Sequence, residues 1–377
     1  MKPHLVVCLL AGLLTGCSQP DDAVADYTEV IVGTYTRKEG HVDGKAAGIY
    51  LMKVNDQGAI QPLDTLKEVV NPSYIALSKD GSWLFAVSEI GPDVDSTGYV
   101  YAYRRTKDRF TFVNRQPTYA HAPCYVSVHP TGKWLYVANY VGGMVARYPL
   151  QPEGIGEASD TLRLQGNGPN EARQESAHPH SVTLSPDGQW VVVADLGTDT
   201  LRVFQADNPK WAATSVLPLP PGAGPRHIAF HPRLPYAYVL NELLNTVTVL
   251  HYNAANGSLH ILDHWSTLPT NFTDFSIGAD IHLTPDGQYL YASNRGHNSL
   301  AAWRIQPEDG RLQPLGHTPT GGDFPRNFTI TADGNQLWVA NQNTDNVRIF
   351  AIDKATGLLE QTGQFEVKTP VCLVVGR

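Results

Sequence analysis

The chain has 377 residues, 42% of them hydrophobic and 17% charged, with 33 glycines and 27 prolines. This length exceeds an ordinary domain of ~100–200 residues unless the fold is a closed β architecture, and the glycine and proline content predicts many tight turns without reaching the low-complexity range. The formal net charge is −8, and lysine and arginine are scattered instead of forming a basic stripe, which argues against nucleic acid as a partner.

The N-terminal segment has the features of an export signal. An apolar run over residues 5–14 follows Lys2, and it is far shorter than the ~20 residues that a membrane-spanning helix needs. Together with the sequence LTGC at residues 14–17, it resembles a bacterial lipoprotein signal, which is cleaved before an acylated cysteine. A generic secretory signal with an incidental cysteine is the alternative.

We therefore expect residues 1–16 to be a lipoprotein signal peptide, Cys17 to be the lipidation site and residues 17–28 to be a polar tether. On this hypothesis the protein is exported and faces the periplasm, and it contacts the membrane only through its lipid anchor. Residues 29–377 remain for a single folded domain.

Within this domain one unit is repeated. Six segments align without gaps, each with a strand, a turn often of the Pro-Asp-Gly type and a second strand rich in Val, Tyr and Trp, which is the pattern of a β-hairpin. Their starts lie 51, 56, 46, 53 and 47 residues apart, a period typical of a solenoid or a propeller. The six segments begin at Pro72, Pro123, Pro179, Pro225, Gly278 and Pro325.

Further strands are expected between the repeated hairpins, for example over residues 98–105 and 346–353. Four strands in about 50 residues form one propeller blade. A truncated seventh copy begins at Pro370, and the first strands, over residues 29–36 and 48–55, have no inner partner. We therefore predict an all-β, seven-bladed β-propeller closed by pairing of the C-terminal strand with the N-terminal strands, because closure removes exposed sheet edges.

The same alignment predicts the state of the two cysteines in this domain. Cys124 follows the proline of its unit by one residue, whereas Cys372 follows by two, so on alternating strands their side chains point in opposite directions. Their strands also belong to blades that a third blade separates. Because a disulfide needs Cα atoms within ~7 Å, we predict two free thiols.

Equivalent positions of the units separate packing from chemistry. Three residues after the initial Pro or Gly, all seven units are apolar, as expected for a packed core. Because side chains alternate along a strand, we expect the position one residue after the initial Pro or Gly to face the same side as this apolar position. The residues at that position are Ser73, Cys124, His180, Arg226, Ala279, Arg326 and Val371. Packing does not explain His180, Arg226 and Arg326, which we expect at the mouth of the central channel.

The end of the second strand provides two more such positions. At the first, five of six units carry Asn or Asp, which we interpret as turn caps that bond their own backbone. Metal ligation is the alternative, but a hard cation prefers several carboxylates and only Asp195 offers one. The second position holds Glu89, Tyr140, Leu196, Glu242, Arg295 and Gln342, and a repeat does not require these charges.

The charged residues from the third, fourth and fifth units should converge on one face of the propeller. With this set the chain resembles the lactonase family of seven-bladed propellers, which includes propeller-type 6-phosphogluconolactonases and 3-carboxymuconate cyclases. The resemblance covers essentially the whole chain after the signal. It is carried by VGTYT from residue 32, HPHSVTLSPDG from residue 178, GPRHIAFHP from residue 224, LNEL from residue 240 and SNRGHNS from residue 293.

The resemblance implies a carboxylic-ester hydrolase that opens a sugar-acid lactone to the free acid, as 6-phosphogluconolactonase does, with no cofactor and no metal. It also implies a catalytic site of one histidine, one glutamate and two arginines, which match His180, Glu242, Arg226 and Arg295. His180 would be the general base, and guanidinium groups would lower the pKa of Glu242 so that it stays a carboxylate. The two arginines would hold an oxyanion or a substrate carboxylate.

Arg326 and Glu89 are expected to contact the substrate at the rim of this site. The partner is then a small lactone, and the protein is expected to be a monomer or a weak dimer. The lipoprotein signal departs from the family's pattern, because the phosphorylated lactone is a cytosolic metabolite.

Two other functions use the same fold. A carboxymuconate-type enzyme that closes or opens a lactone ring would keep the site, whereas a non-catalytic binding module would make the charged cluster a buried ion-pair network. The chain has no GxSxG, HExxH, CxxC or Walker sequence, which lowers support for a serine hydrolase, a zinc-dependent protease or a nucleotide-dependent enzyme. The remaining histidines near the motifs are interpreted as loop or core residues: His178, His227, His282 and His297.

Overall fold

The computed structural model describes residues 1, 27–40, 42–209 and 211–376. The predicted signal peptide, the lipidation site Cys17 and nearly all of the predicted tether lie outside the described residues. The described chain is all-β, with strands β1–β31 and one 3-10 turn, Leu196–Thr198. It contains no helix with the length and apolar character needed to cross a bilayer.

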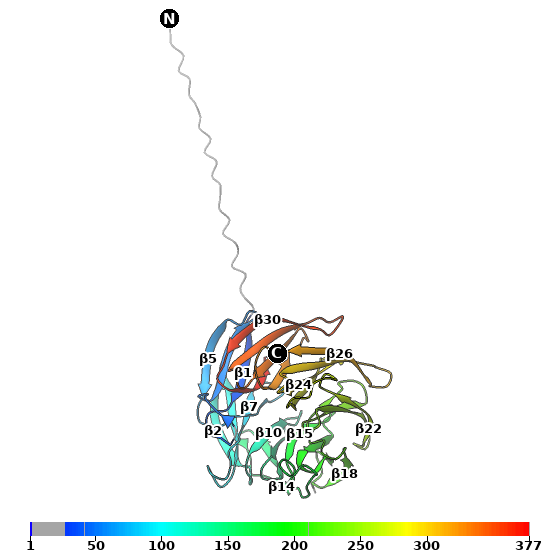
Figure 1. Cartoon of the computed structure of the whole chain (residues 1–377). Coiled ribbons are helices and arrows are strands. Elements are labelled where there is room, and N and C mark those ends of the chain that lie inside the picture. The colour runs from blue at the N-terminus through cyan, green and yellow to red at the C-terminus, as the bar shows by residue number, and fades with distance from the viewer. Residues whose placement is uncertain (2–26, 41, 210, 377) are drawn as a thin grey trace.

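Seven antiparallel sheets form a ring of blades, which confirms the predicted fold (Figure 1). The chain starts in blade 1 and passes through blades 2 to 7 in order before it returns to blade 1. Blade 1 comprises β31 (Pro370–Val375), β1 (Tyr27–Thr34), β4 (Ile49–Asn55) and β5 (Ile60–Leu66); blade 2 comprises β6 (Ile75–Leu77), β7 (Trp83–Ser88), β8 (Tyr99–Thr106) and β9 (Arg109–Pro117).

In blade 3, two short strands pair with the third strand, and blade 4 has the regular four. Blade 3 comprises β10 (Pro123–Val128), β11 (Trp134–Asn139), β12 (Met144–Gln151), β13 (Gly154–Ile155) and β14 (Asp160–Arg163); blade 4 comprises β15 (Pro179–Leu184), β16 (Trp190–Asp195), β17 (Thr200–Gln205) and β18 (Ala213–Pro218).

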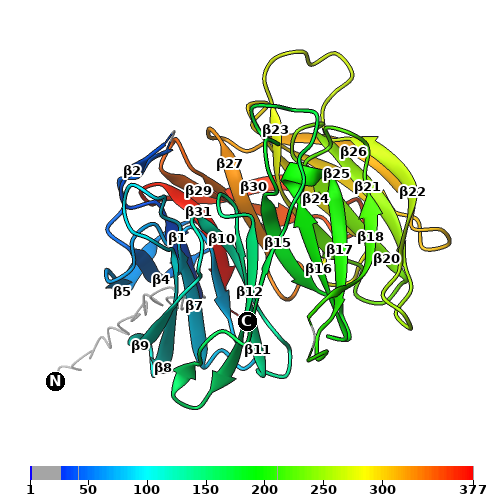
Figure 2. The ribbon, with the colours of Figure 1, turned by 90° about the horizontal axis from the view of Figure 1, so that it is seen from below.

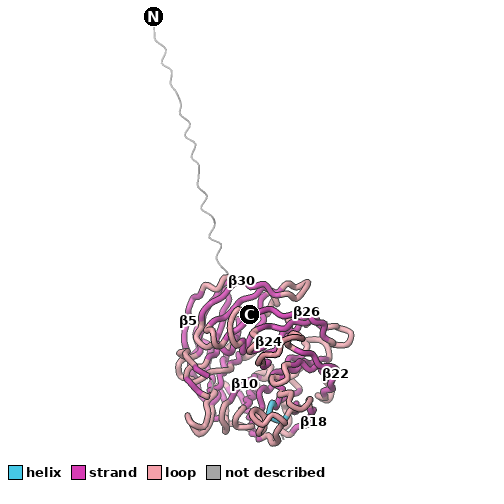
Figure 3. Tube along the Cα trace, in the orientation of Figure 1, coloured by secondary structure: helices cyan, strands magenta, loops and turns pink. Residues whose placement is uncertain are grey.

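Blades 5, 6 and 7 are regular, with strands that alternate with loops along the chain (Figure 3). A small two-stranded hairpin stands outside the blades. Blade 5 comprises β19 (Pro225–Phe230), β20 (Tyr236–Asn241), β21 (Thr246–Tyr252) and β22 (Leu259–Ser266). Blade 6 comprises β23 (Ile277–Leu283), β24 (Tyr289–Arg295), β25 (Ser299–Ile305) and β26 (Leu312–Pro319), and blade 7 comprises β27 (Pro325–Ile330), β28 (Gln336–Asn341), β29 (Asn346–Ile352) and β30 (Leu359–Glu366). The hairpin comprises β2 (Lys38–Glu39) and β3 (Val42–Asp43).

The ring closes as predicted, because the C-terminal strand β31 is the innermost strand of blade 1. It pairs antiparallel with β1, with Val32 opposite Leu373. Cys124 in β10 and Cys372 in β31 are both buried and free, which confirms that prediction. The strands run between two faces of the ring, and the loops that precede β15 and β23 project from the same face (Figure 2).

The hydrophobic core lies between neighbouring blades. One cluster joins Tyr136 and Ala138 of blade 3 to Val182 and Val193 of blade 4, and equivalent clusters fill the other interfaces. The apolar position predicted for packing is at most 6% exposed in all seven units. Its members are Ile75, Val126, Val182, Ile228, Ile281, Phe328 and Leu373.

A β-bulge near the start of the inner strands changes the predicted alternation. In β15, Pro179 pairs with Asp195 and Ser181 with Ala194, so His180 has no partner. The same irregularity leaves Arg226 unpaired in β19 and Arg326 in β27. A bulge redirects side chains locally. The first residue after the proline therefore faces the hub, while the third packs between blades, so the expectation that they share a side is wrong.

The Asn residues that end the second strands join one blade to the next. The side-chain amides of Asn139, Asn294 and Asn341 donate to the carbonyls of Thr118, Thr267 and Thr320, which follow the outer strands of the preceding blades. Asn139 also bonds Met144 within its own turn, as predicted for a cap. These buried amides thus satisfy backbone groups across blade interfaces.

Candidate active site

A cavity of about 530 Å³ lies at the hub, and all seven blades or their loops contribute to its wall. Five of the six residues predicted for catalysis or substrate binding line it: His180, Glu242, Arg295, Arg326 and Glu89. The sixth, Arg226, is 3% exposed and lies behind Glu242, outside the lining. Bulges direct His180 and Arg326 into the hub, whereas Glu89, Glu242 and Arg295 reach it from the ends of second strands.

His180 is held between a thiol and a carboxylate. Its Nδ1 lies 3.8 Å from the Sγ of Cys124, and its Nε2 lies 4.0 Å from Oε2 of Glu242. The ring also packs edge-on against Tyr140, with 5.3 Å between centroids. Burial and the positive charge of Arg226 hold the pKa of His180 well below 6.5, so the imidazole is neutral at pH 7.

Glu242 carries the negative charge of the site. It directly follows β20, where its N–H donates to the carbonyl of Gly224 and its carbonyl accepts from Gly278. The residue is 1% exposed. Burial alone would raise its pKa, but the charges of Arg295, Arg173 and Arg226 hold it well below the usual value.

The three guanidinium groups approach this carboxylate from different sides. Arg295 Nη2 lies 2.8 Å and Arg226 Nε 3.1 Å from Oε2, while Arg173 Nη2 donates to Oε1 at 2.5 Å. The approaches of Arg295 and Arg226 lack hydrogen-bond alignment with Oε2. Oε2 is therefore held by charge and, although buried, has no aligned hydrogen-bond donor among the described residues.

Backbone carbonyls fix two of these arginines. Arg295 Nη2 donates to the carbonyl of Gly278 at 2.6 Å, and Arg226 Nη1 donates to the carbonyl of Ala279. Burial lowers the pKa of Arg295 to about 9, which leaves it charged at pH 7. Gly296 has a φ of +107°, and a Cβ there would collide with the carbonyl of Phe275, so the turn after Arg295 requires glycine.

Arg326 and Glu89 form a second charged group in the same wall. Arg326 Nη2 lies 4.0 Å from Oε2 of Glu89, and the hydroxyl of Tyr35 donates to the same oxygen at 2.9 Å. The guanidinium also stacks on the Tyr35 ring at 5.3 Å. Arg326 is only 9% exposed, so it belongs to the buried wall more than to the rim.

Arg173 was not predicted as a site residue from the sequence. This residue lies in the segment between β14 and β15, outside the repeated unit, and no equivalent position in another blade points to it. The available signal is the interval between Pro123 and Pro179, which at 56 residues is the longest between aligned units. The extra length forms the loop that brings Arg173 over the cavity.

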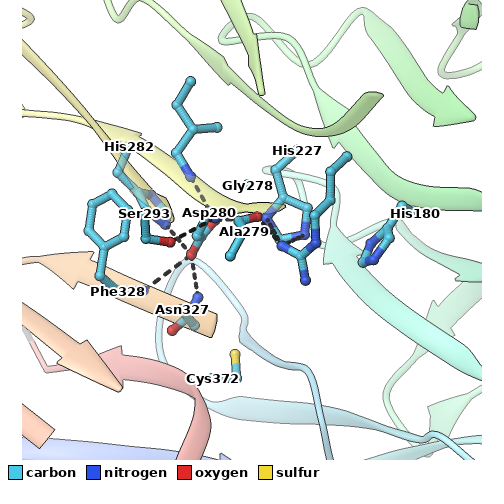
Figure 4. A network of polar contacts seen from close by, with 12 residues as sticks. His180, His227, Gly278, Ala279, Asp280, His282, Ser293, Asn327, Phe328 and Cys372 are labelled. Carbon is cyan, nitrogen blue, oxygen red and sulfur yellow. Dashed lines mark hydrogen bonds and ion pairs between the residues drawn. The ribbon is translucent and has the colours of Figure 1, made fainter. Parts of the chain in front are cut away.

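Asp280 was also missed, and it organises a second polar network in the hub (Figure 4). Its carboxylate accepts from Nδ1 of His227 at 2.7 Å and from Nε2 of His282 at 3.0 Å. It also accepts from the amide of Asn327 and the backbone N–H of Phe328. His227 and His282 thus hold a buried carboxylate, a role that the interpretation as core histidines did not include.

The two histidines of this network stabilise the charged form of Asp280. Burial would raise the pKa of Asp280, but His282 and His227 hold it well below the usual value. Burial and Arg226 lower the pKa of His227 to about 4. Among the described residues, no group of three or more His, Cys, Asp or Glu side chains has an arrangement that could hold a metal ion.

The other two histidines have structural contacts. His178 stacks on Tyr140 with 4.5 Å between centroids, and its Nδ1 lies 2.9 Å from the Tyr140 carbonyl. His297 Nδ1 lies 2.6 Å from the hydroxyl of Ser299.

Fold and site together define a class: a seven-bladed propeller with a charged cavity at its hub. The family described as "Lactonase, 7-bladed beta-propeller" matches residues 29–375, and the chain belongs to this family. Two curated relatives are named 6-phosphogluconolactonase. The one from Bacillus subtilis is 35% identical over 91% of this chain and 96% of its own length, and the one from Formosa agariphila is 31% identical over 89% and 95%.

A solved structure is also similar over nearly its whole length. It is described as the Pseudomonas aeruginosa periplasmic gluconolactonase, PpgL, and it has a TM-score of 0.85 and 31% sequence identity. The match covers 93% of this chain and 99% of that one.

Proposed function

We propose that the protein hydrolyses a sugar-acid lactone and releases the free acid. The observation that carries this proposal is the neutral imidazole of His180 lying 4.0 Å from the anionic Glu242 in a cavity that arginines line. The relatives named 6-phosphogluconolactonase and gluconolactonase support the same reaction.

The arrangement suits attack by water on an ester carbonyl. Nε2 of His180 removes a proton from a water molecule beside the Glu242 carboxylate, and the resulting hydroxide adds to the lactone carbonyl. The oxyanion that forms is stabilised by Arg295 in the wall. Collapse of the tetrahedral intermediate breaks the ring C–O bond, and the proton on His180 passes to the leaving oxygen.

The surrounding residues prepare these groups. Cys124 Sγ lies 3.5 Å from the carbonyl of His180, to which its S–H donates, so the sulfur is free to accept from Nδ1–H. In the proposed mechanism the proton of neutral His180 is on Nδ1, and Nε2 is the base. Arg226 has no contact with the cavity, and its role is to hold Glu242. Arg326 and Glu89 provide polar contacts for the sugar hydroxyls.

Export is part of the proposal. The relative from P. aeruginosa is described as periplasmic, which supports a periplasmic location for this chain as well. Acylation of Cys17 after removal of residues 1–16 would anchor the protein to the membrane, and the folded domain would act as a monomer or a weak dimer. Radiolabelled palmitate should then enter the wild type but not a Cys17→Ser variant.

A lactone panel tests the reaction. Glucono-δ-lactone, its 6-phosphate and a carboxymuconolactone are supplied with and without a chelator, and acid release is followed by pH-stat titration. Turnover of either gluconolactone supports the proposal, whereas turnover of the carboxymuconolactone alone favours the muconate-type reaction. No turnover of any lactone would favour a binding module. Exposed His260→Ala and Glu360→Gln serve as controls for the variants His180→Ala and Glu242→Gln.

A further inference from the structure

Arg173 differs from the other arginines around Glu242 in its exposure. Its side chain is 36% exposed, against 3% for Arg226 and 4% for Arg295. Arg173 lines the cavity, where it bonds Oε1 of Glu242 at 2.5 Å and the hydroxyl of Tyr140 at 3.2 Å. It is therefore the guanidinium group beside Glu242 that a ligand entering the cavity meets first.

The loop that carries Arg173 is fixed by its neighbour. Gln174 is 0% exposed, and its amide donates to the carbonyl of Leu196 at 2.8 Å and to Asp199 at 2.7 Å. Its side-chain oxygen accepts from the N–H of Asn170 at 3.1 Å. The backbone of the loop is thus held without the guanidinium of Arg173, which is free to change its partner.

The charges around Glu242 leave room for an anion. Three guanidinium groups face this single carboxylate, whereas Arg326 has a carboxylate of its own in Glu89. In a buried site an uncompensated positive charge is costly, and an anionic ligand group would offset it. Arg173 can present two parallel N–H groups to a carboxylate or a phosphate.

We propose that Arg173 determines specificity: it binds an anionic group of the substrate, carboxylate or phosphate, and in doing so it releases Oε1 of Glu242 into the cavity. Binding of the charged substrate thereby exposes the carboxylate that orients water. The coupling rests on the proposed lactone hydrolysis, whereas recognition of the anion does not require turnover.

Calorimetry measures recognition without turnover. The probes are gluconate, which has only a carboxylate, glucose 6-phosphate, which has only a phosphate, and 6-phosphogluconate, which has both. For Arg173→Gln we expect a Kd about 10- to 100-fold higher for each probe whose anion Arg173 binds, the range of a charge-assisted hydrogen bond pair. Arg173→Lys should recover part of the loss. Arg311→Gln, at an exposed arginine paired with Asp309, is the matched control and should change nothing.

Kinetics then test the coupling to Glu242. Arg173→Gln should lower kcat/KM for 6-phosphogluconolactone by about 10- to 100-fold, and for the neutral gluconolactone by less than about 3-fold. An equal loss on both lactones, or an unchanged Kd for all three probes, would overturn the inference and make Arg173 a structural ion-pair partner.

The outcomes also separate this inference from the proposed function. If the wild type binds the probes through Arg173 but hydrolyses no lactone, the proposed function fails while recognition of the anion stands. If the wild type hydrolyses lactones and Arg173→Gln has no selective effect, only the inference fails. The melting temperature of Arg173→Gln should stay within a few degrees of wild type, since Gln174 holds the loop.

Discussion

The hub contains two buried carboxylates in contrasting surroundings. Glu242 and Asp280 are each 1% exposed, and positively charged or histidine side chains lower the pKa of both. Asp280 accepts well-formed hydrogen bonds from imidazole, amide and backbone N–H groups. Glu242 is crowded by guanidinium groups, has an oxygen without an aligned donor and opens onto the cavity.

The contrast indicates how structural and functional charge can be distinguished in this fold. A carboxylate whose hydrogen bonds and charge are complete holds blades together, because blades 5, 6 and 7 all donate to Asp280. A carboxylate with surplus positive charge and an incomplete hydrogen-bond shell is prepared for a ligand. The following changes test this distinction.

The largest effect is expected from removing the proposed base. His180→Ala should lower kcat/KM by about 10²- to 10⁴-fold, the usual contribution of a general base. His227 is the matched comparison, because its ring centroid is only 5.5 Å from that of His180 but it belongs to the Asp280 network. His227→Gln should lower the rate of the folded enzyme by less than about 10-fold. Similar losses in both variants, measured as initial rates on the active lactone, would contradict the distinction.

Removing the structural carboxylate should change stability instead. Asp280→Ala leaves His227, His282 and Asn327 without their shared partner, and breaking such a buried network costs about 3–5 kcal/mol. Urea unfolding monitored by tryptophan fluorescence measures the loss at pH 7. The folded fraction should keep its kcat within a few-fold of wild type. A stable but inactive Asp280→Ala protein would assign the network to catalysis.

These two carboxylates also show what sequence reasoning could reach. The seven blades, the closure and the buried apolar position were predictable, because the repeat period and the turn residues are visible in the sequence. The bulge at His180, Arg226 and Arg326 was not, because it is a property of strand pairing and not of residue type. The place of Asp280 in the hub also depends on a bulge, because the pairing of β23 with β24 is irregular between Gly278 and Ile281.

The position of Asp280 therefore carried a signal that alternation concealed. Polar or aromatic residues occupy this position in six of the seven units, namely Tyr74, Tyr125, Ser181, His227, Asp280 and Asn327, and the seventh has Cys372. Arg173 had no such signal, because a loop outside the repeat supplies it. Pairwise distances in the site depend on the closure of the whole ring, which no local pattern specifies.

The pH dependence should differ between the two regions. Because the pKa of His180 is lowered, kcat/KM should stay high as the pH falls through 6.5 and should decline only at lower pH, where the base becomes protonated. At pH 5 a base that titrates at 6.5 would be only about 3% unprotonated, and we expect this enzyme to retain a clearly larger share of its maximal rate. A pH–rate profile from pH 4 to 9 measures this. An acid limb centred at or above 6.5 would contradict the assignment of His180 as a buried neutral base.

Stability follows a different titration. Because the pKa of Asp280 is lowered in the folded protein, its carboxylate stabilises the fold fully at pH values above ~3.9, the pKa of an aspartate in the unfolded chain. This stabilisation is lost as the pH falls through the lower pKa of Asp280 in the folded state. His227 has a pKa of about 4 in the folded protein, whereas a histidine in the unfolded chain binds a proton near pH 6.5. Its protonation in the unfolded state therefore lowers the free energy of unfolding as the pH falls from 6.5 toward 4. Asp280→Asn should flatten the acid end of a stability curve measured by urea unfolding at several pH values.

The smallest effect compares the two thiols. Cys124 lines the cavity beside His180, whereas Cys372 is 2% exposed and lies near the Asp280 network (Figure 4). Burial raises the pKa of both thiols, so both should react slowly with a small neutral reagent such as methyl methanethiosulfonate. Peptide mapping should find Cys124 modified several-fold faster than Cys372 in the native protein, with protection by a saturating lactone product. Faster modification of Cys372 would mean that solvent reaches the hub from the side of Asp280. The cavity beside His180 would then not be the region that small molecules enter.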